Sequence, residues 1–203
     1  LSCVLPSVAA SLGVPPVAQE AAADAQEDGG RLIDLPAADR AVVVLVDGLG
    51  ERLLARRGGH APFLRRLAGE GHRLTCGFPS TTATSMGTFG TGLPPGAHGL
   101  VGYEVLDPPR DLTFNELSWE NGPDPRRWQP SATVFERAAQ AGVAVTMIGP
   151  NYFEGSGLTT AALRGARFRG ARDLPGRVEA ALTALWESPR ALVYLSWGEL
   201  DHV

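Results

Sequence analysis

The chain has 203 residues and a formal net charge of −4, with 44% hydrophobic and 20% charged residues, values typical of a globular protein and not of disordered or collagen-like chains. All 18 basic residues are arginine, so the lysine on which P-loop NTPases, pyridoxal enzymes and protein kinases depend is absent. The acidic balance gives no basic field for nucleic-acid binding, and no run approaches the ~20 apolar residues of a membrane-spanning helix.

Hydrophobic periodicity predicts helices and strands in alternation along the chain. Apolar positions at helical spacing predict a helix over 1–13, and the Ala-, Pro- and acid-rich segment 14–39 is predicted to be a connector. The continuous run 41–46 is typical of a central strand buried on both faces. The remaining predicted elements are helices over 51–57 and 62–69, a helix from Thr81 or Thr82, a hairpin within 101–119 laid over the main sheet, a helix over 133–141 opened by a Thr133/Glu136 capping box, a strand over 143–148, a helix over 174–186 and a strand over 191–197.

This alternation predicts an α/β fold with a mostly parallel sheet and helices on both faces, in one domain over 1–203. Ligands of such folds collect at the carboxyl ends of the strands. The chain opens with Leu1 and ends on Val203 directly after an apolar run, without a capping or polar segment. We therefore expect a fragment at both ends. No signal-peptide pattern is present, and a cytoplasmic location is expected.

Acidic residues follow two of the predicted strands. Asp47 comes directly after the strand 41–46, and Glu199 and Asp201 follow the strand 191–197. In a parallel sheet these acids lie at one edge, where a divalent cation could draw the carboxylates together. An Asp after a strand also serves as a cap of the next helix, and that alternative stays open for Asp47.

A run rich in Ser and Thr, residues 78–86, stands where a helix is predicted to begin. Backbone N–H groups at a helix N-terminus favour an anion, so a hydroxyl there can attack a phosphorus centre whose oxygens the helix holds. A divalent cation would make a threonine hydroxyl reactive by stabilising its alkoxide. The same hydroxyls can also be simple N-caps, and the residues alone leave both interpretations open.

Several of these segments together carry a family resemblance. Val44–Gly48, Phe78–Thr82 and Thr91–Gly102 resemble, in order and spacing, the nucleotide pyrophosphatase/phosphodiesterase family of the alkaline phosphatase superfamily. The similarity extends through 155–159 to 199–201, across nearly the whole chain. The resemblance implies an alkaline-phosphatase-like fold and a two-metal enzyme, usually with zinc, that hydrolyses phosphodiester or pyrophosphate bonds through a covalent threonine intermediate.

Carried over by position, the resemblance implies three functional residues. Asp47 would be a ligand of one metal, and Thr82 would be the nucleophile bound to that metal; Thr82 is chosen over Thr81 and Thr84 because its distance to the segment at Thr91 fits the family's spacing. Asp201 would be a ligand of the second metal. The expected cofactors are two divalent metal ions, zinc by the family's usage.

The chain departs from the family's pattern after Asp201. In the family a His follows this Asp four residues later, and an adjacent Asp-His pair and a final His come further on, whereas this chain ends two residues after Asp201. Asp201-His202 could instead be that adjacent pair, although the preceding strand and Glu199 fit the earlier motif better. We expect the 203-residue chain by itself to have little or no activity, because too few ligands are present.

Two further residues are candidates for substrate binding. Tyr103 stands where many family members place an Asn that contacts the phosphate, and a phenol can also donate a hydrogen bond, with a longer reach. Asn151 follows the strand 143–148 at the expected active edge and could bind a leaving group, or belong to an ordinary loop.

The sequence therefore predicts a metal-dependent phosphohydrolase acting on a small phosphodiester or nucleotide, with no nucleic-acid partner and an undefined oligomeric state. A phosphomonoesterase, mutase or sulfatase of the same superfamily is the first alternative. A non-catalytic α/β remnant or binding module is the second.

Overall fold

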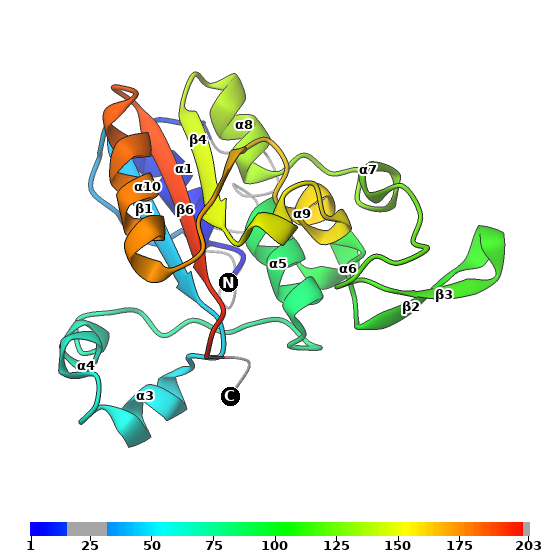
Figure 1. Cartoon of the computed structure of the whole chain (residues 1–203), viewed down its shortest axis with the longest axis horizontal. Coiled ribbons are helices and arrows are strands. Elements are labelled where there is room, and N and C mark those ends of the chain that lie inside the picture. Colours follow the sequence, from blue (N-terminus) through cyan, green and yellow to red (C-terminus); the bar gives the residue numbers. More distant parts are fainter. Residues whose placement is uncertain (16–31, 201–203) are drawn as a thin grey trace.

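The computed structural model describes residues 1–15 and 32–200, and at its centre is a four-stranded parallel sheet (Figure 1). The strands lie in the order β1 (Arg40–Val46), β6 (Ala191–Trp197), β4 (Ala144–Gly149), β5 (Arg167–Gly170). Aliphatic and β-branched runs form β1, β4 and β6, because such side chains fit a pleated and largely buried surface. The predicted α/β fold with a mostly parallel sheet is confirmed.

Strand β6 separates two hydrophobic cores. Leu192 and Tyr194 point to the larger core, whereas Val193 and Leu195 belong to the smaller one, because successive side chains of a strand face opposite sides. All four residues are buried. The sheet is therefore covered on both faces where β6 lies.

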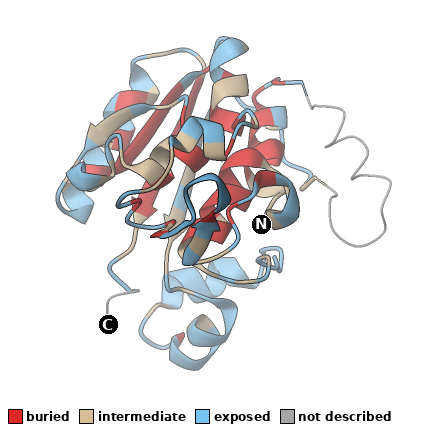
Figure 2. Ribbon diagram, turned by 90° about the vertical axis from the view of Figure 1, so that its right-hand side faces the viewer, coloured by how far each residue is buried: buried red, intermediate tan, exposed pale blue. Residues whose placement is uncertain are grey.

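Helices cover both faces, as predicted. On one face α10 (Leu174–Trp186) packs Ala181 and Ala184 into the smaller core. On the other face lie α1 (Val4–Ser11), α5 (Thr82–Thr91) and α8 (Val134–Gln140). Figure 2 shows that the buried residues gather in the strands and the helices packed on them.

The other elements are short. They are the helices α3 (Glu51–Arg57), α4 (Pro62–Ala68), α6 (Pro95–His98), α7 (Pro125–Trp128) and α9 (Gly157–Ala162), the 3₁₀ turns η1 (Pro108–Arg110) and η2 (Asn151–Phe153), and the strands β2 (Glu104–Asp107) and β3 (Leu112–Asn115). The predicted helices over 51–57, 62–69 and 174–186 are confirmed, as is the capping box that opens α8. No helix in the described part of the chain is both long and apolar enough to cross a membrane.

Within the described residues the strand 41–46 does not take the central place predicted for it. Among the described strands β1 lies at an edge of the sheet and pairs with β6 alone. Val42 and Val44 are 42% and 56% exposed, although Val43 and Leu45 pack against the larger core. The physical reason is that α10 covers chiefly β6 and β4, so one face of β1 is left open by the described residues.

The hairpin predicted within 101–119 is formed by the antiparallel pair β2 and β3. It does not lie over the main sheet as expected: in Figure 1 it extends from the side of the molecule beyond α6. Phe114 of β3 stacks edge-on against Trp119 and Trp128, which gives the hairpin its own small aromatic cluster. These local contacts replace the expected packing on the sheet.

The predicted connector over 14–39 lies mostly outside the described residues, which omit 16–31. The helix predicted over 1–13 is formed by Val4–Ser11, and Gly13 follows it at a φ of +75°. Such a backbone angle favours glycine. Residues 32–38 contain neither helix nor strand.

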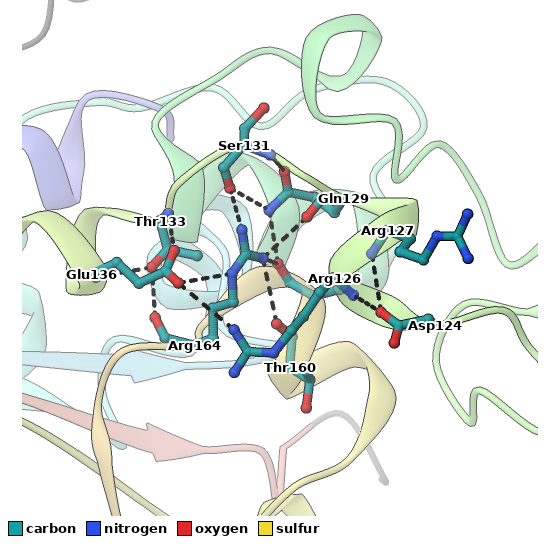
Figure 3. Close-up of polar contacts among 10 residues, drawn as sticks. Asp124, Arg126, Arg127, Gln129, Ser131, Thr133, Glu136, Thr160 and Arg164 are labelled. Atoms are coloured by element: carbon teal, nitrogen blue, oxygen red, sulfur yellow. Dashed lines mark hydrogen bonds and ion pairs between the residues drawn. The ribbon is translucent and has the colours of Figure 1, made fainter.

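A buried arginine ties together the segment that leads from α7 through α8 to α9 (Figure 3). The side chain of Arg164 is 7% exposed, and its Nε donates to Glu136 Oε1 at 3.0 Å. Its terminal nitrogens donate to backbone carbonyls of other residues, namely Gln129, Ser131 and Ala161 at 3.1, 2.6 and 2.8 Å. Glu136 also closes the capping box with Thr133, so one charged pair fixes the start of α8 and the end of α9.

Candidate active site at the carboxyl edge of the sheet

The carboxyl ends of the four parallel strands surround one cavity of about 1010 Å³. Each strand is followed by a polar residue that lines it: Asp47 after β1, Glu199 after β6, Asn151 after β4 and Arg172 after β5. Thr82, the first residue of α5, lines the same cavity. The structure therefore brings together four of the residues singled out from the sequence, namely Asp47, Thr82, Asn151 and Glu199.

Asp47 is held by the backbone on both sides. Its N–H donates to the carbonyl of Trp197 at 2.8 Å, which continues the β1–β6 pairing by one residue. The next residue, Gly48, turns the chain at a φ of +76° and donates its N–H to Asp47 Oδ1 at 2.9 Å. The other carboxylate oxygen, Oδ2, has no hydrogen-bond partner among the described residues. Asp47 thus presents one free oxygen from a fixed position.

The three threonines at the start of α5 have different environments. Thr81 is the N-cap: its hydroxyl accepts from Thr84 N at 3.4 Å and donates to Thr84 Oγ1 at 2.9 Å. Thr84 is fully buried. Thr82 is half-buried, lines the cavity, and its hydroxyl has no partner among the described residues. Capping therefore occupies two of the hydroxyls and leaves that of Thr82 available.

The floor of the cavity contains a buried phenol. Burial raises the pKa of Tyr194, and the nearby negative charge of Asp47 raises it further. The hydroxyl donates to Met86 Sδ at 3.8 Å, and both side chains line the cavity. Tyr194 is therefore a neutral group in the same cavity as Asp47 and adds no second negative charge there.

Arg177 and Glu199 form an ion pair at the wall of the cavity. Arg177 donates to Glu199 Oε1 at 3.0 Å and to the carbonyl of Ser196 at 2.7 Å, and its guanidinium lies 4.7 Å from the ring centre of Trp197. The arginine side chain is almost completely buried, whereas that of Glu199 is half exposed. These contacts fix the segment that follows β6 and compensate the charge of Glu199.

His98 braces the loop between α5 and the hairpin. Its Nδ1 accepts from Leu100 N at 3.1 Å, so the ring proton lies on Nε2, which donates to Thr88 Oγ1 at 3.0 Å. The ring packs against Gly87, where an added Cβ would lie 2.6 Å from the ring. Burial lowers the pKa of His98 to about 4, so the imidazole is neutral at pH 7.

We expect the free energy of unfolding to show a component that depends on the titration of His98. The unfolded state takes up a proton near pH 6.5 and the folded state only near pH 4, so this component is complete above pH 6.5 and is lost as the pH falls toward 4. The loss amounts to about 3 kcal/mol at most. Urea unfolding from pH 7.5 to 4.5 should show the difference between the unchanged protein and His98→Gln shrinking as the pH falls. A constant difference would contradict this, and the exposed His72→Gln is the matched control.

Glu116 is a buried carboxylate that the sequence analysis missed. It accepts from the backbone N–H groups of Val101 and Gly102 at 2.9 and 3.1 Å and from the indole of Trp128 at 2.9 Å. Burial raises the pKa of Glu116, and these three hydrogen bonds act in the opposite direction. The carboxylate holds the loop that leads to Tyr103. No local pattern indicates this role, because the partners lie 12 to 15 residues away.

A comparison with protein families identifies the family of this chain. The family described as type I phosphodiesterase / nucleotide pyrophosphatase matches residues 41–203, well over half of the chain. The chain belongs to this family. The resemblance seen in the sequence is thereby confirmed. A comparison with curated protein sequences finds no match.

Two solved structures share the fold of this phosphodiesterase-family chain. A phosphonoacetate hydrolase from Sinorhizobium meliloti 1021, in complex with phosphonoacetate, is 20% identical with a TM-score of 0.57, over 80% of this chain and 47% of that one. Murine ectonucleotide pyrophosphatase/phosphodiesterase 5 is 19% identical with a TM-score of 0.59, over 80% of this chain and 44% of that one. The present chain thus spans less than half the length of either protein. At these identities the likeness concerns the fold.

Two other residues named from the sequence lie elsewhere. Tyr103 is 49% exposed at the start of the hairpin and is not among the residues that line the cavity. It is tied to the loop through its carbonyl, which accepts from Glu116 N at 2.8 Å. Asp201 and the neighbouring His202 lie outside the described residues.

Members of this phosphodiesterase family generally depend on divalent metal ions. Within residues 1–15 and 32–200 no three His, Cys, Asp or Glu side chains gather as a metal cluster. Asp47 and Thr82 nevertheless line the same cavity, and neither Asp47 Oδ2 nor the Thr82 hydroxyl has a partner among the described residues. Both are oxygen ligands that divalent cations accept. The two residues therefore fit part of a metal site.

Proposed function

We propose that the protein to which this chain belongs is a metal-dependent hydrolase of small phosphodiesters or pyrophosphates, of the nucleotide pyrophosphatase/phosphodiesterase type, with Thr82 as its nucleophile. The observation that carries the proposal is the available Thr82 hydroxyl at the first position of α5, in the same cavity as Asp47. Membership of the phosphodiesterase family supports the same reaction.

In this proposal each residue has a defined task. The N-terminus of α5 orients backbone N–H groups and the positive end of the helix dipole toward the phosphate oxygens. Thr82 Oγ1 attacks the phosphorus in line, the leaving alcohol or phosphate departs, and water later hydrolyses the threonyl-phosphate ester. Asp47 and Thr82 would hold a divalent cation, zinc by the family's usage, which supplies stabilisation of the threonine alkoxide.

Three further assignments complete the proposal. Asp201 is a ligand of a second cation, which the family resemblance supports. Asn151 contacts the substrate, which its position in the cavity beside β4 supports. Tyr103 also contacts the substrate, although in the structure it lies outside the cavity wall, so an approach of its loop would be needed.

The reaction class is tested by rates on matched esters. We expect the full-length protein with zinc to hydrolyse bis(4-nitrophenyl) phosphate with a kcat/KM about tenfold or more above that for 4-nitrophenyl phosphate and 4-nitrophenyl sulfate. Removal of metal with a chelator should abolish turnover, and added zinc should restore it. A preference for the monoester or the sulfate ester would contradict the proposal. Hydrolysis of none of the three, without zinc binding in a calorimetric titration, would favour a non-catalytic module.

For residues 1–203 alone we propose little or no turnover. The described residues offer Asp47 and Thr82 as metal ligands in the cavity. They contain no cluster of three acidic, His or Cys side chains, which supports this proposal. The same diester assay on the 203-residue chain tests it, and a rate equal to that of the full-length protein would contradict it.

A further inference from the structure

Two arginines line the cavity, and only one of them has partners within the described part of the chain. The guanidinium of Arg177 donates to Glu199 and to the carbonyls of Ala171 and Ser196, and it lies over the ring of Trp197. Arg172 is exposed and forms neither a hydrogen bond nor an ion pair within residues 1–15 and 32–200. The cavity thus contains one guanidinium without a ligand from the described protein.

The backbone on both sides of Arg172 is fixed. Ala171 donates its N–H to the carbonyl of Gly149 at 3.0 Å and accepts from Arg177 at 3.2 Å. On the other side Asp173 caps α10 by accepting from Gly176 N at 2.9 Å. A charged side chain on an anchored backbone loses less conformational freedom when it binds a ligand than one on a mobile loop.

Arg172 lies at the opposite end of the cavity from the proposed site of bond cleavage. In strand order Glu199 and Asn151 stand between Asp47 and Arg172. Three intervals between neighbouring strands separate β1 from β5, which corresponds to about 14 Å between their backbones. The ligand of Arg172 is therefore a group at some distance from the phosphorus that Thr82 attacks.

Asn151 and Arg172 share this far end of the cavity. An added Cβ at Gly170 would lie 1.6 Å from Asn151 Oδ1. Asn151 can therefore pack against the end of β5 only because residue 170 is glycine. A guanidinium presents a rigid, weakly hydrated fork of donors that matches phosphate and carboxylate oxygens. Arg172 therefore offers such a fork of donors at the end of the cavity that lies farthest from Asp47 in strand order.

We propose that Arg172 binds a second anionic group of the substrate, a phosphate or a carboxylate, several bonds away from the scissile phosphorus. This inference rests on the proposed phosphodiester hydrolysis and makes Arg172 a residue that determines specificity. The preferred substrates are then diesters that carry a further negative charge on one ester arm.

The test uses diaryl phosphates in which one ring carries a neutral methyl group, a carboxylate or a phosphonate, the anions being attached through spacers of one to four methylene groups. Both phenols are quantified by liquid chromatography, so cleavage of either ester bond is counted. The proteins are the full-length protein, Arg172→Ala and the matched control Arg167→Ala. The control removes the same charge from the start of β5, which does not line the cavity.

We expect Arg172→Ala to lower kcat/KM by about 10- to 100-fold for at least one anionic arm and spacer, as for the loss of a charge-assisted hydrogen bond, with the neutral diester changed less than about threefold. The arm whose kcat/KM falls more identifies the preferred anion as a carboxylate or as a phosphate-like group. Arg167→Ala should behave as the unchanged protein. Equal effects on neutral and anionic diesters, or no effect with any arm and spacer, would overturn the inference while the proposed function stands. Failure of the unchanged protein to cleave the neutral diester would instead overturn the proposed function.

Discussion

Thr82→Ala is expected to abolish phosphodiester hydrolysis in the full-length protein, with kcat reduced by a factor on the order of 10⁴ or more. The substitution removes the hydroxyl that faces the cavity and leaves the capping bond between Thr81 and Thr84 in place. The fold should therefore be retained, which circular dichroism and urea unfolding would check. Steady-state rates with bis(4-nitrophenyl) phosphate measure the effect.

Two variants serve as controls for this prediction. Thr82→Ser retains a hydroxyl and should recover part of the activity, whereas Thr81→Ala removes the N-cap, costs about 1 kcal/mol of stability and retains the nucleophile. Acid quenching during turnover, followed by mass spectrometry, should detect a phosphate ester on Thr82. Undiminished activity of Thr82→Ala, or equal losses in Thr81→Ala and Thr82→Ala, would contradict the role given to Thr82.

Arg164→Met should destabilise the protein by about 2–4 kcal/mol, because it removes the closer of the two arginine partners of Glu136 and a donor to buried backbone carbonyls. Glu136 Oε1 loses its 3.0 Å contact and the carbonyl of Gln129 loses its donor at 3.1 Å. The carbonyls of Ser131 and Ala161 keep the Gln129 side-chain amide as a donor. Methionine has a similar length, so the cost of a cavity is kept small. Urea unfolding at pH 7 measures the change.

The matched control is Arg126→Ala. Arg126 reaches the same Glu136 oxygen at 4.0 Å, but its side chain is mostly exposed, and exposed ion pairs contribute about 0–1 kcal/mol. Figure 3 shows the two arginines on the same carboxylate. A loss below 1 kcal/mol for Arg164→Met, or similar losses for both variants, would show that the buried network does not hold α8 and α9 together.

Local patterns predicted the parts of the fold that depend on neighbouring residues. The run before Asp47 had to be a strand, and Thr133 with Glu136 specified the start of α8, because both signals lie within a few residues. β5 was not predicted, since its four residues, Arg167–Gly170, are too short and too polar to show a strand pattern. The edge position of β1 depends on which strands pair, which hydrophobicity along one segment does not specify.

The residues of the candidate site that follow local sequence signals were predictable, and those that depend on the tertiary fold were not. Asp47 and Thr82 follow strong local signals, and the structure places both in the cavity. Arg172 had no signal, because it follows the strand that was not predicted and its significance comes from the lack of a partner in three dimensions. Glu116 likewise depends on a loop that the fold brings back to it.

The pairing of β1 with β6 has a consequence for biosynthesis. Among the described strands β1 has no partner other than β6, and the N–H of Asp47 is bound by the carbonyl of Trp197. At about 5–20 residues per second, a ribosome completes Trp197 roughly 8–30 s after Asp47. Until then β1 lacks its strand partner β6, and the hydrogen bond from Asp47 N to Trp197 O cannot form. The candidate active site is thus among the last parts of these 203 residues to assemble, and its formation coincides with the pairing of β1 with β6.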